Sequence, residues 1–150
     1  MSYLTQKTIK NNIYFSGVAL HSGVDVNVCI KPAEPNFGIV FKRVDLKSNN
    51  LIYPNFMNVT NTSLNTTVEN EFGAKVSTIE HLMGALFGLG IDNALIEINN
   101  EEVPILDGSA KNFIEKIISA GTKVSDAPIK IIKINKEVEF ADGERFISIK

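Results

Sequence analysis

The ten residues Ser77-Thr-Ile-Glu-His-Leu-Met-Gly-Ala-Leu86 decide the fold, because they are typical of the first turns of an amphipathic helix. The apolar residues among them recur at helical spacing and should face a core: Ile79, Leu82, Met83 and Leu86. Ser77 is followed three residues later by Glu80, which predicts a capping box with Ser77 as the N-cap. Glycines at positions 88 and 90 predict the end of this helix.

Strands are expected on both sides of this helix. Residues 26–30 alternate apolar and polar side chains, which is the pattern of a half-buried strand. Residues 38–43 and residues 94–98 are rich in β-branched and apolar side chains and predict two further strands. Residues 47–65 are polar and rich in asparagine, so we expect them to be mostly loop.

A second helix is predicted from Ser109 to Ala120. Its inward-facing residues should be Phe113, Ile114, Ile117 and Ile118. Either Asp107 or Ser109 can cap its start, and Gly121 should end it.

The pattern changes after residue 128 to one that favours strands. Residues 129–140 and 145–149 predict a hairpin around an Asp142-Gly143 turn. A lone hairpin is marginal in water. We therefore expect residues 126–150 to be a linker and the opening hairpin of a truncated second domain. Residues 1–125 should form an α+β domain, in which two helices pack on one face of a β-sheet.

Composition narrows the class of protein. The chain has 150 residues, of which 44% are hydrophobic and 21% are charged, values that exclude a disordered tail, a collagen-like repeat and a disulfide scaffold. A net charge of −2 argues against nucleic acid as the main partner. One cysteine, Cys29, allows no intrachain disulfide and suits a reducing compartment. We find no apolar signal or membrane-spanning stretch and expect a cytoplasmic protein.

Glu80 and His81 are the main candidates for chemistry. A helix N-terminus favours an ionised carboxylate and disfavours a protonated imidazole. Those are the forms in which a glutamate acts as a base and a histidine binds zinc. Small residues follow His81 at helical spacing and would let another backbone or a ligand approach: Gly84, Ala85 and Gly88. The alternative is that Glu80 only caps the helix and His81 is a polar surface residue.

Three other side chains have simpler interpretations. His21 lies in a Leu-His-Ser-Gly turn between two predicted strands and is read as a turn histidine. Asp107 precedes the second helix and is read as an ordinary helix cap. Cys29 has no base beside it in sequence and is read as a structural thiol. No phosphate-binding loop, dinucleotide-binding glycine pattern or Cys-x-x-Cys pair occurs.

Six blocks of sequence, taken together, change this interpretation. They are, in order, Gly17-Val-Ala-Leu-His-Ser-Gly23, Lys31-Pro-Ala33, Gly38-Ile-Val-Phe-Lys-Arg-Val-Asp-Leu46, Ser77-Thr-Ile-Glu-His-Leu-Met-Gly-Ala-Leu86, Gly88-Leu-Gly-Ile-Asp-Asn93 and Val103-Pro-Ile-Leu-Asp-Gly-Ser-Ala110. In this order and at this spacing they closely resemble the N-terminal half of the UDP-3-O-acyl-N-acetylglucosamine deacetylases, which act in lipid A synthesis of Gram-negative bacteria. The resemblance runs from about residue 8 to residue 150.

The resemblance implies two domains of similar topology, whose helices are sandwiched between their sheets. It implies a catalytic zinc held by two histidines and an aspartate, of which His81 is one, with Glu80 as the general base. The other two ligands would belong to the second domain, beyond this chain. Leu64, Asn65 and Thr66 match a segment that borders the substrate cleft, although many members carry a cysteine in place of Asn65. Asp107 matches an aspartate near the active site and is given a supporting role.

The expected function is therefore that of half an enzyme. The whole protein would be a zinc-dependent hydrolase that removes acetate from UDP-3-O-acyl-N-acetylglucosamine, with the missing C-terminal domain as partner and the 150-residue piece inactive alone. One alternative is a stand-alone domain that binds a nucleotide sugar or a protein without catalysis. Another is a structural α+β domain in which the Glu-His pair only caps a helix.

Overall fold

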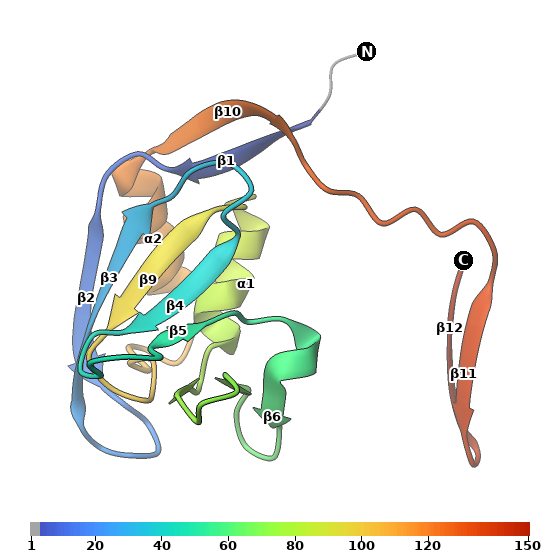
Figure 1. Ribbon diagram of the computed structural model, residues 1–150, viewed down its shortest axis with the longest axis horizontal. Coiled ribbons are helices and arrows are strands. Elements are labelled where there is room, and N and C mark those ends of the chain that lie inside the picture. Colours follow the sequence, from blue (N-terminus) through green and yellow to red (C-terminus); the bar gives the residue numbers. More distant parts are fainter. Residues whose placement is uncertain (1–3) are drawn as a thin grey trace.

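Strands with one apolar face build the largest element of the fold, a mixed five-stranded sheet (Figure 1). The computed structural model describes residues 4–150. The sheet order is β2 (Ile13–Val18), β3 (Asp25–Pro32), β9 (Ala94–Ile98), β4 (Ile39–Arg43) and β5 (Leu51–Ile52). β4 and β9 are parallel, and the other neighbours are antiparallel. The three strands predicted near residues 26–30, 38–43 and 94–98 are thus confirmed.

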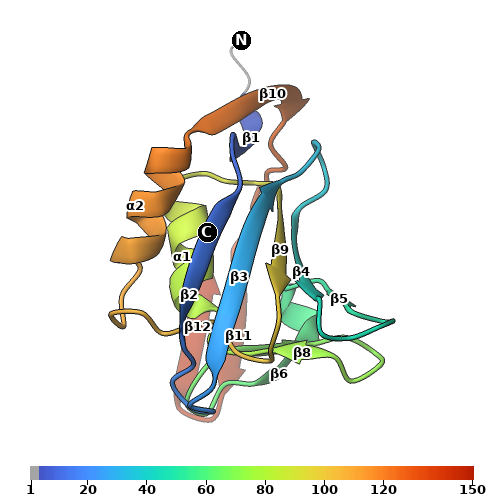
Figure 2. The ribbon, with the colours of Figure 1, turned by 90° about the vertical axis from the view of Figure 1, so that its left-hand side faces the viewer.

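Two helices cover one face of this sheet, as Figure 2 shows. They are α1 (Glu80–Gly88) and α2 (Lys111–Ala120), and both were predicted. The α+β arrangement with two helices on one face of the sheet is therefore confirmed. Phe15 of β2 meets Phe113 of α2 with 4.9 Å between ring centroids, which joins the two layers. No helix within residues 4–150 is long and apolar enough to cross a membrane.

The core lies between the helices and the sheet. Most of its fully buried large side chains come from these two layers, and they include Phe41, Phe113, Ile9, Ile30, Ile52, Leu82, Leu86, Ile96, Ile98 and Ile117. The predicted inward face of α1 is confirmed, with Met83 partly buried at its edge. The prediction for Ile118 is wrong, because 63% of this residue is exposed. Each residue advances about 100° around a helix, so Ile118 turns away from the core that buries Ile117.

The predicted capping box of α1 is wrong. The N-cap residue is Ile79, and in the part of the chain that the structure describes no side chain caps the helix. Ser77 is instead bound to the segment after β9: its N–H and its hydroxyl both donate to the carbonyl of Glu101, at 2.8 and 3.2 Å. At α2 the N-cap is Ala110, but the Ser109 hydroxyl oxygen still accepts the Lys111 N–H at 3.1 Å.

Residues 47–65 are mostly loop, as predicted, and several short elements lie between β4 and α1. They are β5, a 3-10 turn η1 (Phe56–Asn58), β6 (Val59–Asn61), β7 (Thr67–Glu69) and β8 (Lys75–Val76). β6, β7 and β8 form a small antiparallel sheet. This small sheet leads directly into the start of α1.

β1 (Thr5–Ile9) and β10 (Thr122–Pro128) pair antiparallel across one end of the molecule (Figure 1). The strand predicted over residues 129–140 is wrong for residues 129–137, which are irregular. A strand requires a neighbour for its backbone groups, and no other described strand lies beside these residues. The predicted hairpin is confirmed in β11 (Val138–Asp142) and β12 (Arg145–Ile149), which pair with each other.

Adjacent isoleucines on α2 provide a test of this packing. Ile117→Ala removes a fully buried side chain and should lower the free energy of unfolding by about 2–5 kcal/mol. Ile118→Ala changes an exposed side chain and should alter it by about 0.5 kcal/mol or less. Urea unfolding of both variants measures the difference. Similar losses in the two variants would contradict the orientation of α2.

Candidate functional site

The first turn of α1 carries the two candidate residues side by side. Glu80 is the first residue of the helix, His81 is the second, and both are half-buried. The Thr66 N–H donates to Oε2 of Glu80 at 3.1 Å. Among residues 4–150 this is the hydrogen bond that anchors the carboxylate, and it leaves Oε1 open to another donor.

The loop before β7 lies against this helix start. Asn65 donates through Nδ2 to Oγ1 of Thr78 at 3.2 Å and accepts the Thr67 hydroxyl at 3.0 Å. Together with the bond from Thr66, these contacts place Asn65 and Thr66 next to Glu80. Leu64 is also in this loop, and its side chain is 83% exposed. Two of the three predicted substrate-binding residues therefore lie against the candidate site, and the third faces solvent beside them.

Thr78 has a strained backbone. Its φ is +54°, in the left-handed region that a β-branched residue rarely adopts, and it is buried. Such a conformation costs about 1–3 kcal/mol and persists only where the surroundings fix it. The Thr78 hydroxyl donates to Oε1 of Glu102 at 2.9 Å. Thr78 stands two residues before Glu80, so its conformation sets the direction in which α1 begins.

Glu102 is a buried carboxylate that sequence reasoning missed. It accepts the N–H groups of His21 and Ser22 at 3.0 Å each, and the Ser22 hydroxyl at 3.0 Å. Burial raises the pKa of the Glu102 carboxyl, but the hydrogen bonds from these groups and from Thr78 outweigh burial. They leave that pKa below its ordinary value of 4.5. The carboxylate is therefore ionised and fully bonded inside the fold.

The remaining predicted residues lie elsewhere. His21 is exposed, and its backbone N–H, not its imidazole, makes the contact with Glu102. Cys29 is a half-buried free thiol on β3. Asp107 is exposed in the turn before α2, where hydrogen bonds from the Ser109 hydroxyl and N–H lower the pKa of its carboxyl. Among the described residues no hydrogen bond joins Asp107 to Glu80 or His81, so its supporting role stays a prediction.

His81 is the candidate metal ligand of this site. Within residues 4–150 no three His, Cys, Asp or Glu side chains are grouped so that they could hold a metal ion. His81 offers one half-buried imidazole next to a carboxylate. A catalytic zinc usually has three protein ligands, and His81 fits the part of one of them.

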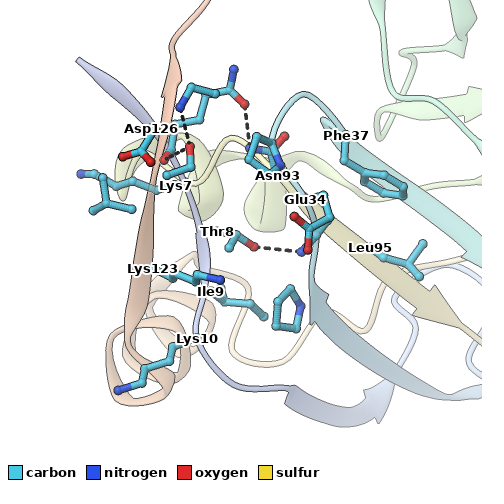
Figure 3. A pocket seen from close by; sticks show the side chains of 17 residues that line it. Lys7, Thr8, Ile9, Lys10, Glu34, Phe37, Asn93, Leu95, Lys123 and Asp126 are labelled. Carbon is cyan, nitrogen blue, oxygen red and sulfur yellow. Dashed lines mark hydrogen bonds between the residues drawn. The ribbon is translucent and has the colours of Figure 1, made fainter. Parts of the chain in front are cut away.

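A cavity of about 720 Å³ lies at the other end of α1 (Figure 3). It is bordered by β1, β10 and the loop after β3, with Lys7, Lys123 and Glu34 around it. It also reaches Asn93, which follows the C-terminal end of α1, whereas Glu80 begins that helix. Nine residues of helix span about 13 Å. The cavity and the Glu80–His81 pair are therefore separate features.

These observations define a class: an α+β domain that presents one carboxylate and one imidazole at the start of a sheet-packed helix. Residues 6–150 match the family model described as UDP-3-O-acyl N-acetylglycosamine deacetylase. The chain belongs to this family.

Curated relatives agree with the family model. The chain is 46% identical over 145 residues to the UDP-3-O-acyl-N-acetylglucosamine deacetylase of Cellvibrio japonicus, which covers 97% of the chain and 48% of the relative. It is 48% identical over 142 residues to the protein of that name from Teredinibacter turnerae, covering 95% and 46%. The relative from Geotalea uraniireducens is 46% identical over 96% of the chain and 47% of its own length. The chain thus spans about half the length of the curated relatives it matches.

The buried carboxylate of Glu102 should make the free energy of unfolding depend on pH. Below pH 4.5 the unfolded chain takes up a proton that folded Glu102 excludes, so the free energy of unfolding falls as the pH drops through this range. Urea unfolding between about pH 3 and about pH 6 measures this for the wild type and for Glu102→Gln. The stability gap between the two proteins should shrink toward low pH. A gap that stays constant would show that Glu102 has no lowered pKa.

Proposed function

We propose that the complete protein is a zinc-dependent deacetylase that hydrolyses the acetyl amide of UDP-3-O-acyl-N-acetylglucosamine. The observation that carries this proposal is the Glu80 carboxylate, held by the Thr66 N–H beside His81 in the first turn of α1. Membership of the family and the names of the curated relatives support the choice of substrate and reaction. The activity would contribute to lipid A synthesis in the cytoplasm of a Gram-negative bacterium.

Glu80 is the proposed general base. With Oε2 fixed by Thr66, Oε1 can take a proton from a water molecule as that water attacks the acetyl carbon. A new C–O bond forms, the amide C–N bond breaks, and the products are acetate and a free amine. The departing nitrogen takes up the proton that Glu80 removed from water, which regenerates the carboxylate, and the acetic acid formed ionises to acetate. Fixing one oxygen of the carboxylate reduces the number of orientations that compete with the reactive one.

His81 is the proposed zinc ligand from this chain. Zinc supplies Lewis acidity when bound, which favours both deprotonation of water and attack on an amide carbonyl. The imidazole of His81 is half-buried in the first turn of α1, directly after the proposed base. The further ligands belong to the part of the protein outside this chain.

The substrate would lie along the loop that contains Leu64, Asn65 and Thr66. Thr66 already bonds to Glu80, so a substrate held by this loop lies close to the proposed base. The exposed apolar side chain of Leu64 suits contact with an apolar part of the substrate. Asp107 would support the site from the turn before α2.

The domain organisation is part of the proposal. Residues 1–125 would form the first domain, and residues 126–150 the linker and first hairpin of a second. The exposed apolar side chains of this hairpin, including Phe140, Phe146 and Ile147, support the idea that it packs against more protein. The exposed side of α1 supports the same idea. Phe87 is 89% exposed there, and a Cβ added at Gly84 or Gly88 would meet nothing within 4 Å.

Replacing the proposed base tests the reaction. Glu80→Gln in the complete protein should keep its zinc but lose turnover by about 100- to 10,000-fold, because an amide cannot take the proton. Acetate release and metal content are the measurements. Glu115→Gln, on the exposed side of α2, serves as the control and should turn over like the wild type. Turnover by Glu80→Gln within a few-fold of the wild type would remove Glu80 from this role.

The ligand count provides a second test. Residues 1–150 alone should bind zinc weakly and show no measurable deacetylation, since a single imidazole does not make a catalytic zinc site. Zinc titration and an acetate-release assay of the purified piece measure both properties. Turnover by the piece that disappears on chelation would contradict the proposed sharing of ligands.

A further inference from the structure

Glu102 is a buried charged side chain to which the proposed reaction assigns no role. Only 3% of it is exposed, yet within residues 4–150 it pairs with no cation and lies among hydrogen-bond donors. Four donors from two distant segments converge on its two oxygens. Burial of a carboxylate is costly unless every oxygen is bonded, so this site is built around a fixed charge.

One of those donors is the hydroxyl of Thr78, which lies two residues before the first residue of α1. The Thr78 hydroxyl donates to Oε1 of Glu102, while its oxygen accepts the side-chain N–H of Asn65. A left-handed conformation at a β-branched residue does not persist from local preference. The hydrogen bond to Glu102 is one side-chain contact that holds Thr78 in this conformation, and the Asn65 contact is the other.

Thr78 is connected to Glu80 in two ways. The first is the backbone, because Glu80 follows two residues later and begins α1. The second passes through the loop: Asn65 is bonded to Thr78, and its neighbour Thr66 donates to the Glu80 carboxylate. Both the position of the carboxylate and the group that anchors it therefore depend on Thr78, which is held by Glu102.

Glu101, the residue before Glu102, is by contrast exposed at the surface. The side chain of Glu101 is 51% exposed, 3.4 Å from the ammonium of Lys75 and 3.6 Å from the guanidinium of Arg43. The pair with Lys75 is exposed and contributes little, and the buried Arg43 has a closer partner in Asp45, at 2.6 Å. Glu101 and Glu102 thus differ in burial and partners while sharing residue type and location, which makes Glu101 a matched control.

We propose that Glu102 is a positioning residue for the reaction: through the Thr78 hydroxyl it fixes the start of α1 and the 65–67 loop, and so sets where the Glu80 carboxylate lies. This inference rests on the proposed role of Glu80 as base. A glutamine at position 102 would keep the shape of the side chain but direct N–H groups at donors, which breaks the network. The oriented base would then sample other positions, and misplacement of about 1 Å can cost about 100-fold in rate.

The kinetic test uses the complete protein with its zinc. Glu102→Gln and Thr78→Val should each lower kcat by about 10- to 100-fold, with KM changed by less than about threefold and zinc content unchanged. Thr78→Ser keeps the hydroxyl and should restore kcat to within about threefold of the wild type. Glu101→Gln should have wild-type kinetics. Because both changes act through one contact, the double variant Glu102→Gln/Thr78→Val should lose little more than either single variant.

A readout independent of activity accompanies the kinetics. Hydrogen–deuterium exchange of the 64–67 segment should become faster in Glu102→Gln, because the Thr66 N–H loses its fixed acceptor, and should be unchanged in Glu101→Gln.

If Glu102→Gln folds with wild-type kcat and exchange, the inference is overturned while Glu80 keeps its role. Loss of kcat that tracks loss of zinc, or normal turnover in Thr78→Val, overturns it as well. If the wild type proves inactive on this substrate, the proposed function fails, and unchanged exchange in Glu102→Gln would separately overturn the positioning role.

Discussion

The parallel pairing of β4 with β9 is the constraint on which the rest of the structure depends. Parallel neighbours cannot be joined by a tight turn, so the chain between them must cross back over the sheet. That crossover contains α1, which therefore packs on the sheet with its N-terminus near the carboxyl ends of both strands. Sites in sheets with parallel strands typically lie at this edge. The Glu80–His81 pair thus has its place because of strand direction.

Polar side chains at that edge of the sheet hold the segment that leads into α1. Arg43 ends β4, is only 4% exposed, and binds both oxygens of Asp45 as well as the carbonyl of Lys75 at 2.9 Å. Ser77 then bonds to the carbonyl of Glu101 beyond the end of β9. These contacts connect the last residue of one parallel strand to the segment after the other. The strain at Thr78 can be maintained because the backbone on both sides of it is held.

Periodicity predicted the parts of this fold whose neighbours are local. The alternation near residues 26–30 and the helical spacing around Leu82 are set by a single buried face, so they can be read from one segment. The prediction that Ile118 faces the core was wrong because the apolar stripe of α2 is wider than the face that the core covers. This stripe consists of Phe113, Ile114, Ile117 and Ile118. β10 was missed because its side chains are mostly exposed, and only its pairing with β1 makes it a strand.

The residues of the candidate site also differ in whether they could be predicted from the sequence. Glu80 and His81 could be found from their order in sequence, and the adjoining loop from its resemblance to a family segment. Glu102 and Thr78 could not. The contact between Glu102 and His21 joins residues 81 positions apart, and Thr78 adopts a conformation against its own preference. The best signal in the sequence was a pair of adjacent glutamates, in which nothing distinguishes the buried one from the exposed one.

The antiparallel pairing of β1 with β10 has a mechanical consequence. Thr5 pairs with Pro128, and the Ile129 N–H donates to the carbonyl of Leu4 at 3.0 Å, so the chain enters and leaves this ribbon at the same end. Tension applied through the segments that flank the ribbon would break the backbone hydrogen bonds between β1 and β10 one after another, starting at that end. The load would not reach the five-stranded sheet until the ribbon had parted.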